Sequence, residues 1–268
     1  MLERCDNIQF KKTELSNYLK GGSLIINLFQ PIAPSLNRST FPSPVVCENN
    51  EPLIQLTAAH PRIFMEPIYY QQQIPDSLRV IYVREGVYER LQQALTLLPQ
   101  EYCLLLYDGY RPFQVQQYLF SHFSQQLAKR MPQLTPQEIV QATKKYVAFP
   151  SKDVAYLAPH LTGGAIDVTL ADVHGKALDL GTAFDEMNEK SATRYFEQHT
   201  QENPFACQHR RLLYNCMTLA GFTNYAEEWW HYDYGNVAWA RRVQTQVAQY
   251  GAVHATIQNH NVKEFRFL

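Results

Sequence analysis

The chain of 268 residues lacks the features that mark several large classes of protein. Its apolar runs fall short of the ~18–20 residues that a membrane-spanning helix needs. No cluster of Lys and Arg stands out, and the formal net charge of −1 provides no basic field for nucleic acid or an anionic membrane surface. The remaining composition, 46% hydrophobic and 18% charged residues, is that of an ordinary globular protein.

Cysteine is scarce, and its spacing excludes two kinds of cross-linked fold. The chain has five cysteines, widely spaced and without a Cys-x-x-Cys pair: Cys5, Cys47, Cys103, Cys207 and Cys216. An odd, dispersed set fits neither a disulfide framework nor a thiolate zinc site. We interpret Cys103 and Cys216 as buried free thiols, because both stand among apolar residues. With acidic residues and no apolar stretch at its start, the sequence predicts a cytoplasmic protein and leaves a periplasmic location as the alternative.

Common catalytic signatures are also missing. The sequence contains no His-Glu-x-x-His, no Gly-x-Ser-x-Gly, no phosphate-binding P-loop and no dinucleotide fingerprint. Two other segments carry chemically useful residues. In the first, His160 stands seven residues before Asp167, with a Gly-Gly pair between them. In the second, Glu228 stands three residues before His231.

These residues together make a candidate metal site. His160, Asp167 and His231 offer two imidazoles and a carboxylate, a ligand set that suits Zn²⁺. A catalytic zinc site keeps a fourth position open for water, whose pKa the metal lowers to about 7. Glu228 is then a candidate general base for that water. Residues three apart on a regular strand point to opposite faces, so Glu228 and His231 can converge only where the segment is bent, bulged or helical.

Arg111 is a further candidate residue. It lies in the turn Asp108-Gly109-Tyr110-Arg111-Pro112, where Gly and Pro restrict the backbone. A fixed guanidinium can stabilise the oxyanion of a hydrolytic intermediate. Each residue alone also has an ordinary structural interpretation: Arg111 as a loop cation, Asp167 as an edge charge, and the Trp229-Trp230 pair as core.

Hydrophobic periodicity predicts a mixture of strands and helices. Short apolar or β-branched runs predict strands at 79–83, 102–107, 164–170 and 222–225, with a possible further strand at 23–29. Helical spacing predicts helices at 87–98, 115–127, 135–142, 210–220 and 239–251. This mixture favours an α+β fold over a doubly wound sheet. Residues 1–45 are Pro- and Ser-rich toward their end, and we interpret them as an N-terminal extension to a single domain spanning 46–268.

Three of the expected helices have recognisable end signals. Thr135-Pro136-Gln137-Glu138 has the form of a capping box with Pro at the first helical position. Gly221 is a suitable residue just beyond the helix at 210–220. Pro112 suits the first turn of the helix that includes Val115.

The candidate residues occur in an order that resembles the D-alanyl-D-alanine dipeptidase family, zinc D,D-peptidases that include the dipeptidase of vancomycin resistance. The matching segments are Tyr107–Pro112, His160–Leu170, Phe184-Asp185 and Gly221–Tyr232. The resemblance covers about residues 46–250 and is specific as a combination. It implies an α+β domain with a central antiparallel sheet flanked by helices, a fold shared with the hedgehog signalling domain.

The resemblance also implies roles for individual residues. The three metal ligands correspond to His160, Asp167 and His231, which would hold one Zn²⁺. Glu228 corresponds to the catalytic base, and Arg111 to the cation that polarises the scissile carbonyl and holds the intermediate.

The match to the family is less complete for the substrate-binding residues. Asp185 corresponds to an aspartate that binds the free amino group of the substrate, for which an anionic partner is suited. Trp229 is a further candidate for substrate contact. The family often has a serine two residues before the first ligand histidine, where this chain has Ala158, and the loop before His160 looks longer. These departures leave the zinc chemistry untouched and bear on the identity of the substrate.

The resulting interpretation is a zinc dipeptidase that hydrolyses D-Ala-D-Ala to two D-alanines in peptidoglycan metabolism. One alternative is a D,D- or L,D-carboxypeptidase or amidase that acts on longer peptidoglycan peptides. The other is a non-catalytic, zinc-stabilised binding module. The expected partner is a small D,D-dipeptide, with neither nucleic acid nor a membrane span, and the sequence leaves the oligomeric state open.

Overall fold

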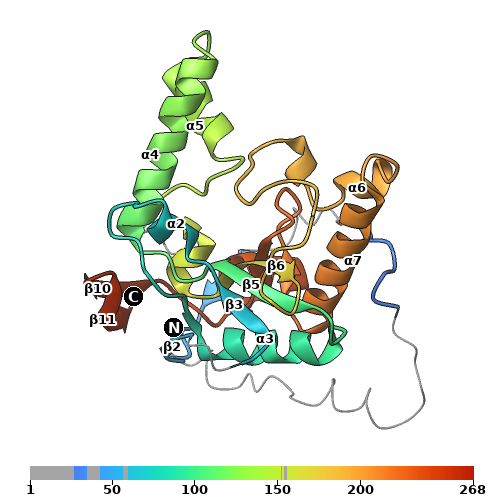
Figure 1. The fold of residues 1–268 in the computed structure, drawn as a ribbon. Coiled ribbons are helices and arrows are strands. Elements are labelled where there is room, and N and C mark those ends of the chain that lie inside the picture. Colours follow the sequence, from blue (N-terminus) through green and yellow to red (C-terminus); the bar gives the residue numbers. More distant parts are fainter. Residues whose placement is uncertain (1–26, 35–42, 57–59, 152, 154–155) are drawn as a thin grey trace.

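A five-stranded sheet forms the centre of the protein (Figure 1). The computed structural model describes residues 27–34, 43–56, 60–151, 153 and 156–268. The strand order is β3 (Ile63–Met65), β5 (Cys103–Asp108), β6 (Ala165–Ala171), β8 (His231–Asp233) and β7 (Thr223–Asn224). Neighbouring strands are antiparallel except β3, which runs parallel to β5. The predicted α+β fold with a central, largely antiparallel sheet is confirmed.

The main core lies between this sheet and two helices, α3 (Glu85–Leu97) and α7 (Pro204–Leu219), which also contact each other. On β6, Ile166, Val168 and Leu170 enter this core, because alternate residues of a strand share one face. Each such buried aliphatic side chain contributes about 1.5–3 kcal/mol to folding. Asp167, between them, is therefore directed to the opposite face, where the candidate site lies.

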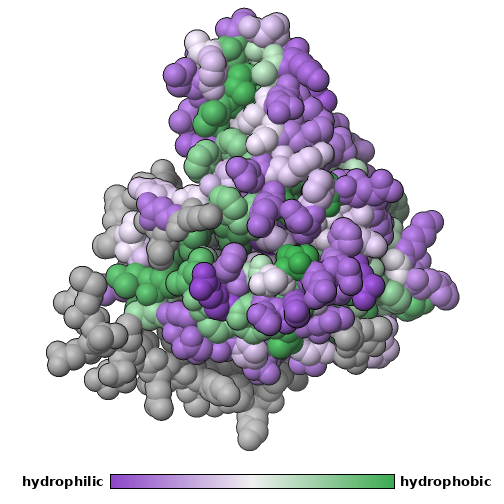
Figure 2. All heavy atoms as spheres, turned by 90° about the vertical axis from the view of Figure 1, so that its left-hand side faces the viewer, coloured by the Kyte–Doolittle hydropathy of each residue, from purple (hydrophilic) through white to green (hydrophobic). Residues whose placement is uncertain are grey.

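Two helices project from one end of the molecule, α4 (Phe113–Arg130) and α5 (Pro136–Thr143) (Figure 1). They pack against each other, and the predicted capping box of α5 is present, with Thr135 and Glu138 bonded reciprocally. Figure 2 shows the projection from another side, with hydrophilic side chains over much of its visible surface. The chain leaves α5 at Lys144 and returns toward the sheet.

Shorter elements surround the sheet. They are β1 (Val45–Val46), paired with β9 (Val247–Ala248); β2 (Leu53–Gln55), paired with β4 (Tyr82–Arg84); the hairpin β10 (Val253–Gln258) and β11 (Asn261–Phe267); helices α2 (Ile68–Gln71), α6 (Tyr195–Gln198) and α8 (Val237–Val243); and the 3-10 helices η3 (Pro159–Thr162) and η4 (Glu189–Ser191). None of the helices in the described ranges has the length and apolarity needed to cross a membrane. Cys103, Cys207 and Cys216 are free thiols, and Cys103 and Cys216 are buried as predicted.

The prediction of a C-terminal helix at 239–251 was wrong for the second half of that range. Helix α8 ends at Val243, and Gln244 adopts a left-handed conformation with φ of +59°. Val247 instead belongs to β9, where it pairs with Val45. A two-residue strand with a partner some two hundred positions away leaves no periodicity to detect, so the apolar spacing alone predicted a continuous helix.

The observed bounds of other helices and strands also differ from the predicted ones. The strand expected at 79–83 begins only at Tyr82, and the helix expected at 210–220 begins at Pro204, behind an Asn203 side-chain cap. Gly221, with φ of +98°, ends that helix as predicted. The C-terminal hairpin of β10 and β11 was not predicted at all, because its alternating burial is shallow and its outer face is exposed.

Part of the N-terminal region can be described. The possible strand at 23–29 lies mostly outside the described residues, and its last residues, 27–29, form the start of a turn. Ile32 is buried, its N–H donates to Glu197, and its carbonyl accepts from Arg194 Nε at 2.9 Å. The division at residue 45 between extension and domain stays a prediction.

Arg84 connects the segment before the sheet to the helix that carries His160. Its side chain is fully buried and forms a bidentate ion pair with Glu48 at 2.8–2.9 Å. Further bonds reach three backbone carbonyls, those of Glu51, Thr162 and Gly251. One guanidinium thus holds together chain segments from both ends of the domain and anchors η3.

We expect Arg84→Met to lower the free energy of unfolding by about 3–5 kcal/mol, because the Glu48 carboxylate and three carbonyls lose their partner. Urea denaturation followed by circular dichroism measures this loss. Lys129→Met, an exposed cation removed from α4, is the control and should change stability by less than about 0.5 kcal/mol. Equal midpoints for the two variants would contradict the anchoring role of Arg84.

Candidate active site

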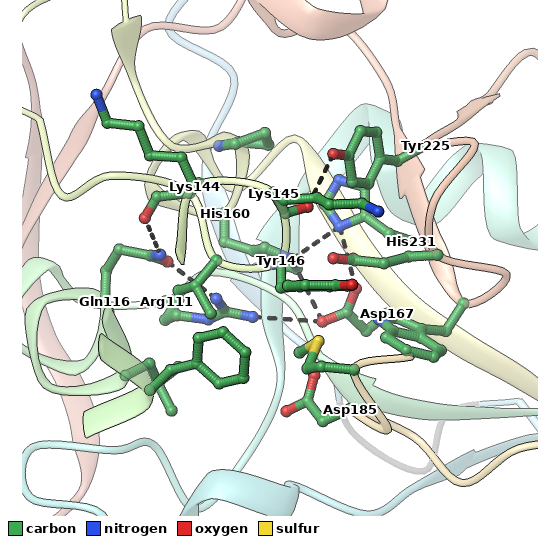
Figure 3. Close-up of a pocket in the computed structure, with 18 of the residues that line it drawn as sticks. Arg111, Gln116, Lys144, Lys145, Tyr146, His160, Asp167, Asp185, Tyr225 and His231 are labelled. Carbon is green, nitrogen blue, oxygen red and sulfur yellow. Dashed lines mark hydrogen bonds and ion pairs between the residues drawn. The ribbon is translucent and has the colours of Figure 1, made fainter. Parts of the chain in front are cut away.

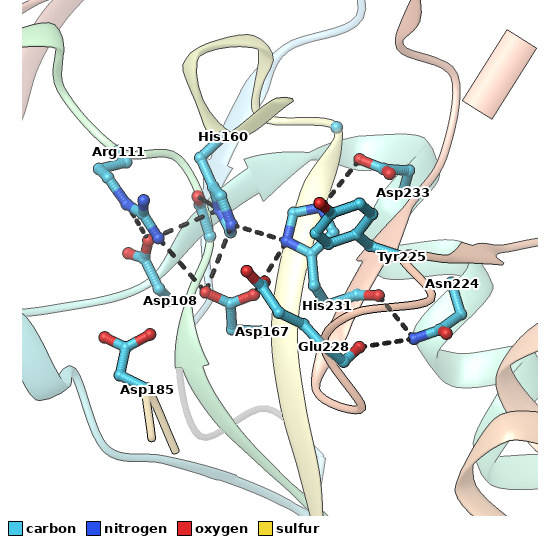
Figure 4. Close-up of polar contacts among 12 residues, drawn as sticks. Asp108, Arg111, His160, Asp167, Asp185, Asn224, Tyr225, Glu228, His231 and Asp233 are labelled. Atoms are coloured by element: carbon cyan, nitrogen blue, oxygen red, sulfur yellow. Dashed lines mark hydrogen bonds and ion pairs between the residues drawn. The ribbon is translucent and has the colours of Figure 1, made fainter. Parts of the chain in front are cut away.

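Three predicted metal ligands meet in one buried cluster (Figure 4). Asp167 of β6 and His231, the first residue of β8, are paired across adjacent strands, and His160 comes from η3. His231 Nδ1 lies 3.2 Å from Asp167 Oδ1 and 3.1 Å from His160 Nε2. His160 Nε2 lies 3.3 Å from Asp167 Oδ2. One ligand atom from each residue therefore converges on a common point, within 4.8 Å of the others.

A left-handed glycine fixes the path from η3 into β6. Gly163 follows the helix with φ of +67°, a conformation that side-chain-bearing residues rarely adopt. A Cβ at this position would also lie 2.8 Å from Leu53 Cδ1. The turn that Gly163 permits returns the chain at once, so that His160 lies beside Asp167.

Each imidazole is oriented through its other ring nitrogen. His160 Nδ1 donates to the Gly109 carbonyl at 2.7 Å, and His231 Nε2 donates to Asp233 Oδ1 at 3.2 Å. With neutral rings, the two facing nitrogens then present lone pairs toward the Asp167 carboxylate. Such groups repel one another at these distances unless a cation lies between them. The donor set therefore fits Zn²⁺, whose histidine ligands are commonly oriented by a carbonyl or carboxylate in this way.

Asp167 is ionised although it is buried. Burial alone disfavours its charge, but with protonated imidazoles in place of a metal the His160 charge and hydrogen bonds from both rings hold the pKa of Asp167 well below its usual range, and a bound cation takes over this role when the rings are neutral. Arg111 adds a further positive charge, with Nη2 3.3 Å from Asp167 Oδ2. The carboxylate is therefore available as an anionic ligand at neutral pH.

Arg111 is held rigidly beside the metal cluster. Its Nε donates to Asp108 at 2.7 Å, Nη1 to Gln116 at 2.9 Å, and Nη2 to the Tyr69 hydroxyl at 3.2 Å. The Arg111 N–H donates to the His160 carbonyl at 3.1 Å. Burial alone would lower the pKa of Arg111, but Tyr69 and nearby carboxylates raise it above its ordinary value. The side chain is thus a permanent cation in a fixed position.

A β-bulge places Asp108 next to Asp167. Leu106 pairs with Val168, whereas Asp108 pairs with Asp167, so that Tyr107 is an extra residue on β5. A bulge re-aims the side chains that follow it, here toward the site. The sequence indicated a strand and a turn in this region but carried no signal for the bulge.

Glu228 lies in a turn immediately before β8, so the predicted bend in this segment is present. Its N–H donates to the Tyr225 carbonyl, and its own carbonyl accepts from Asn224 Nδ2, each at 3.0 Å. The carboxylate is directed toward the ligand residues (Figure 4). Burial raises the pKa of Glu228 to about 8, although the His231 charge opposes the shift. A carboxylate with these properties beside a metal site is suited to proton transfer.

Asp185 lies on the side of the site that holds Arg111, away from Glu228 and His231 (Figure 4). Its backbone is left-handed, with φ of +59°, and its Oδ2 accepts from the Tyr69 hydroxyl at 2.9 Å. Burial raises the pKa of Asp185 to about 7, with the charge of Asp167 contributing. Among the described residues it forms no ion pair, so an ammonium group could take that place.

The two adjacent tryptophans face different surroundings. Trp229 is buried, and its Nε1 donates to Thr182 Oγ1 at 2.8 Å. Trp230, and not Trp229, is among the residues that line the cavity. Substrate contact by Trp229 stays a prediction. Ala158, at the expected serine position, is buried at the start of η3.

The site residues surround a cavity of about 740 Å³ (Figure 3). The structure brings six predicted residues to this cavity: Arg111, His160, Asp167, Asp185, Glu228 and His231. Sequence reasoning missed Tyr69, Gln116, Tyr225 and Asp233, which bond to them or line the same cavity. Only Asp233 had a local signal, because it lies two residues after His231 on one strand and hence on the same face.

The buried His-Asp-His set, with a carboxylate and an arginine beside it, has the groups of a mononuclear metal-dependent hydrolase. A family model described as D-ala-D-ala dipeptidase matches residues 63–250. The chain belongs to this family of peptidases.

Curated proteins and a solved structure resemble the chain to different degrees. A D-alanyl-D-alanine dipeptidase of Synechocystis is 34% identical over 194 residues, which cover 64% of this chain and 78% of that protein. One of Escherichia coli is 37% identical over 130 residues, 48% of this chain and 54% of that protein. The crystal structure of a vancomycin resistance D,D-pentapeptidase, VanY, in complex with Zn(II) is 17% identical, covers 62% of this chain and 80% of that one, and aligns with a TM-score of 0.34. That structural similarity is too low to support any inference.

We expect one Zn²⁺ per chain, and a melting temperature that falls on chelation and recovers when Zn²⁺ is added. A ligand that binds only the folded state stabilises it by about 2.7 kcal/mol at a hundred times its Kd. His231→Ala should lose both the bound metal and this response. His122→Ala, which removes an exposed imidazole from the same cavity, should keep both. Metal analysis and differential scanning calorimetry test this, and a fully metallated His231→Ala protein would contradict the assignment.

Proposed function

We propose that this protein hydrolyses D-Ala-D-Ala to two D-alanines at a zinc site formed by His160, Asp167 and His231, in the metabolism of peptidoglycan. The observation that carries the proposal is the convergence of these ligands with Glu228 and Arg111 in one cavity. Membership in the D-ala-D-ala dipeptidase family and the names of the curated relatives support the choice of substrate.

Zinc, when bound, supplies Lewis acidity and makes a water nucleophilic at neutral pH. Glu228 takes the proton of the attacking water and later delivers it to the amine of the leaving D-alanine. Arg111 donates to the oxygen of the scissile carbonyl as negative charge develops there. Its bonds to Asp108 and Gln116 hold it in place, so little reorganisation is needed during the reaction.

Asp185 would bind the ammonium group of the substrate. Burial raises the pKa of this carboxyl, and the positive charge of an ammonium group would lower it again by stabilising the ionised form. The Tyr69 hydroxyl already donates to one of the carboxylate oxygens. A bond of this kind requires a free amino terminus next to the scissile bond. It would therefore favour a dipeptide over a longer chain.

A second candidate, cleavage of longer peptidoglycan peptides, is favoured by the size of the cavity and by Ala158 at the expected serine position. A panel of D,D-, L,D- and L,L-dipeptides beside a pentapeptide stem, with product analysis, separates the two activities. Release of D-alanine from the pentapeptide at a rate exceeding that from the dipeptide would favour the second.

Glu228→Ala should lower kcat for D-Ala-D-Ala by about 10²–10⁴-fold, because proton transfer is lost, while the zinc content stays at one per chain. Release of D-alanine from the dipeptide is the measurement. Glu227→Ala removes the neighbouring, exposed carboxylate and should retain full activity. Equal rates for the wild type and Glu228→Ala would refute the mechanism, and no turnover in any of the three would favour a non-catalytic binding module.

The KM for D-Ala-D-Ala should rise as pH falls through about 7, because protonation of Asp185 removes the negative charge that attracts the substrate ammonium. In Asp185→Asn the KM should be high and nearly independent of pH over the same range. Glu189→Gln, an exposed carboxylate outside the cavity, should keep the wild-type profile. Steady-state kinetics from pH 5 to 9 test this prediction, and an unchanged profile in Asp185→Asn would contradict it.

A further inference from the structure

The residues Lys144–Ala148, which we call the strap, form the wall of the cavity on the side away from Asp185 (Figure 3). Tyr225, which precedes Glu228 in the same turn, donates from its hydroxyl to the Lys145 carbonyl at 3.2 Å. This bond fixes the strap above the metal ligands.

A second bond fixes the other end of the strap. Gln116 Nε2 donates to the Ala148 carbonyl at 2.7 Å, while Gln116 Oε1 accepts from Arg111 Nη1 at 2.9 Å. Gln116 is buried, and its bond to Arg111 is buried with it, whereas the bond to Ala148 is partly exposed. The position of the strap is therefore coupled to that of Arg111, and side chains on the strap have a defined place relative to the reacting groups.

The cations that line the cavity differ in their partners. Arg111 and Arg242 are already bonded to carboxylates, Arg242 through Nη1 to Asp233 at 2.8 Å. Lys145 forms no ion pair with any of the described residues, and its ammonium lies 5.3 Å from the ring centroid of Tyr146. In Figure 3 that ammonium lies on the same side as Tyr225 and His231.

Its neighbour Lys144 is directed elsewhere. The Lys144 ammonium lies 5.2 Å from the ring centroid of Phe149, and Figure 3 shows it pointing away from the metal ligands. Arg130 is the last residue of α4, at the far end of the projecting helix. Lys145 is thus the cation of the strap that faces the reaction centre, and Lys144 is an adjacent cation of the same type that does not.

We infer that Lys145 binds the carboxylate of the leaving residue and makes the free C-terminus of the substrate a requirement of this site. The inference rests on the proposed function. With the ammonium at Asp185 and the scissile carbonyl beside Arg111, the remaining end of a dipeptide extends toward the strap. Acidic residues such as Asp167 and Asp185 line this cavity and disfavour a further carboxylate, so the carboxylate of the substrate needs a cation whose charge is not already neutralised.

The chemistry of lysine suits this task. A lysine ammonium is a compact point charge on a flexible stem, and it can follow a carboxylate as the leaving D-alanine departs. The class of substrate is then a peptide with one residue beyond the scissile bond and a free α-carboxylate. A dipeptide amide has the same scissile bond but lacks the group that Lys145 recognises.

The test compares D-Ala-D-Ala with D-alanyl-D-alaninamide as substrates of the zinc-loaded protein. In Lys145→Met the KM for the free acid should rise about ten-fold, the effect of losing one charge-assisted contact, while the KM for the amide stays unchanged. Lys145→Arg should retain most of the preference for the acid. Lys144→Met should behave as the wild type with both substrates. The inference would be overturned if Lys145→Met raised the KM equally for the acid and the amide. It would also be overturned if Lys145→Met and Lys144→Met raised the KM for the acid equally.

A binding measurement separates this inference from the proposed function. Calorimetry with zinc-loaded Glu228→Gln protein compares the affinities for the acid and the amide without turnover. If the wild type hydrolyses neither substrate, the proposed function fails. If Glu228→Gln binds the acid more tightly than the amide and Glu228→Gln/Lys145→Met does not, the carboxylate site at Lys145 is supported even then. If Glu228→Gln binds the acid and the amide equally, the inference is overturned.

Discussion

The balance of charge in the cavity is the constraint on which the rest of the site depends. The carboxylates of Asp167, Asp185, Glu228 and Asp233 line this cavity, and Asp108 lies beside it, bonded to Arg111. Removing a carboxylate from water is strongly unfavourable unless a cation or hydrogen-bond donors compensate it. Arg111 lies between two of these groups, and Arg242 pairs with a third. The two ligand imidazoles and a bound cation complete the compensation, which is why metal, arginine and carboxylates form one unit.

The sheet makes this arrangement possible because it separates the charged face from the apolar one. On β6 the residues on either side of Asp167 enter the core with α3 and α7, and Asp167 itself faces the cavity. The adjacent strand adds His231 directly opposite, and Arg84 anchors the short helix that carries His160. The metal ligands are therefore held by elements whose own stability comes from the opposite face. Such support keeps the ligands near their working geometry.

Opposite charges are also separated across the cavity, with a carboxylate on one side and a lysine on the other. Asp185 and Lys145 lie on either side of the metal ligands and of Arg111 (Figure 3). A short peptide with charges at both ends has the complementary pattern. The strap between α5 and η3 contributes the cationic end, so this stretch of irregular chain takes part in forming the site.

The sequence by itself determined the chemistry. The types and order of His160, Asp167, Glu228 and His231 indicated zinc hydrolysis, and strong periodicity and capping signals located α3, β5, β6 and the start of α5. These are local properties, set by neighbouring residues. Only the tertiary structure decided which distant groups meet the site, such as Tyr69 and Gln116 on Arg111, the bulge at Tyr107, and β9 in place of a helix. Those contacts depend on strand register and packing between remote segments, which leave no trace in the spacing along the chain.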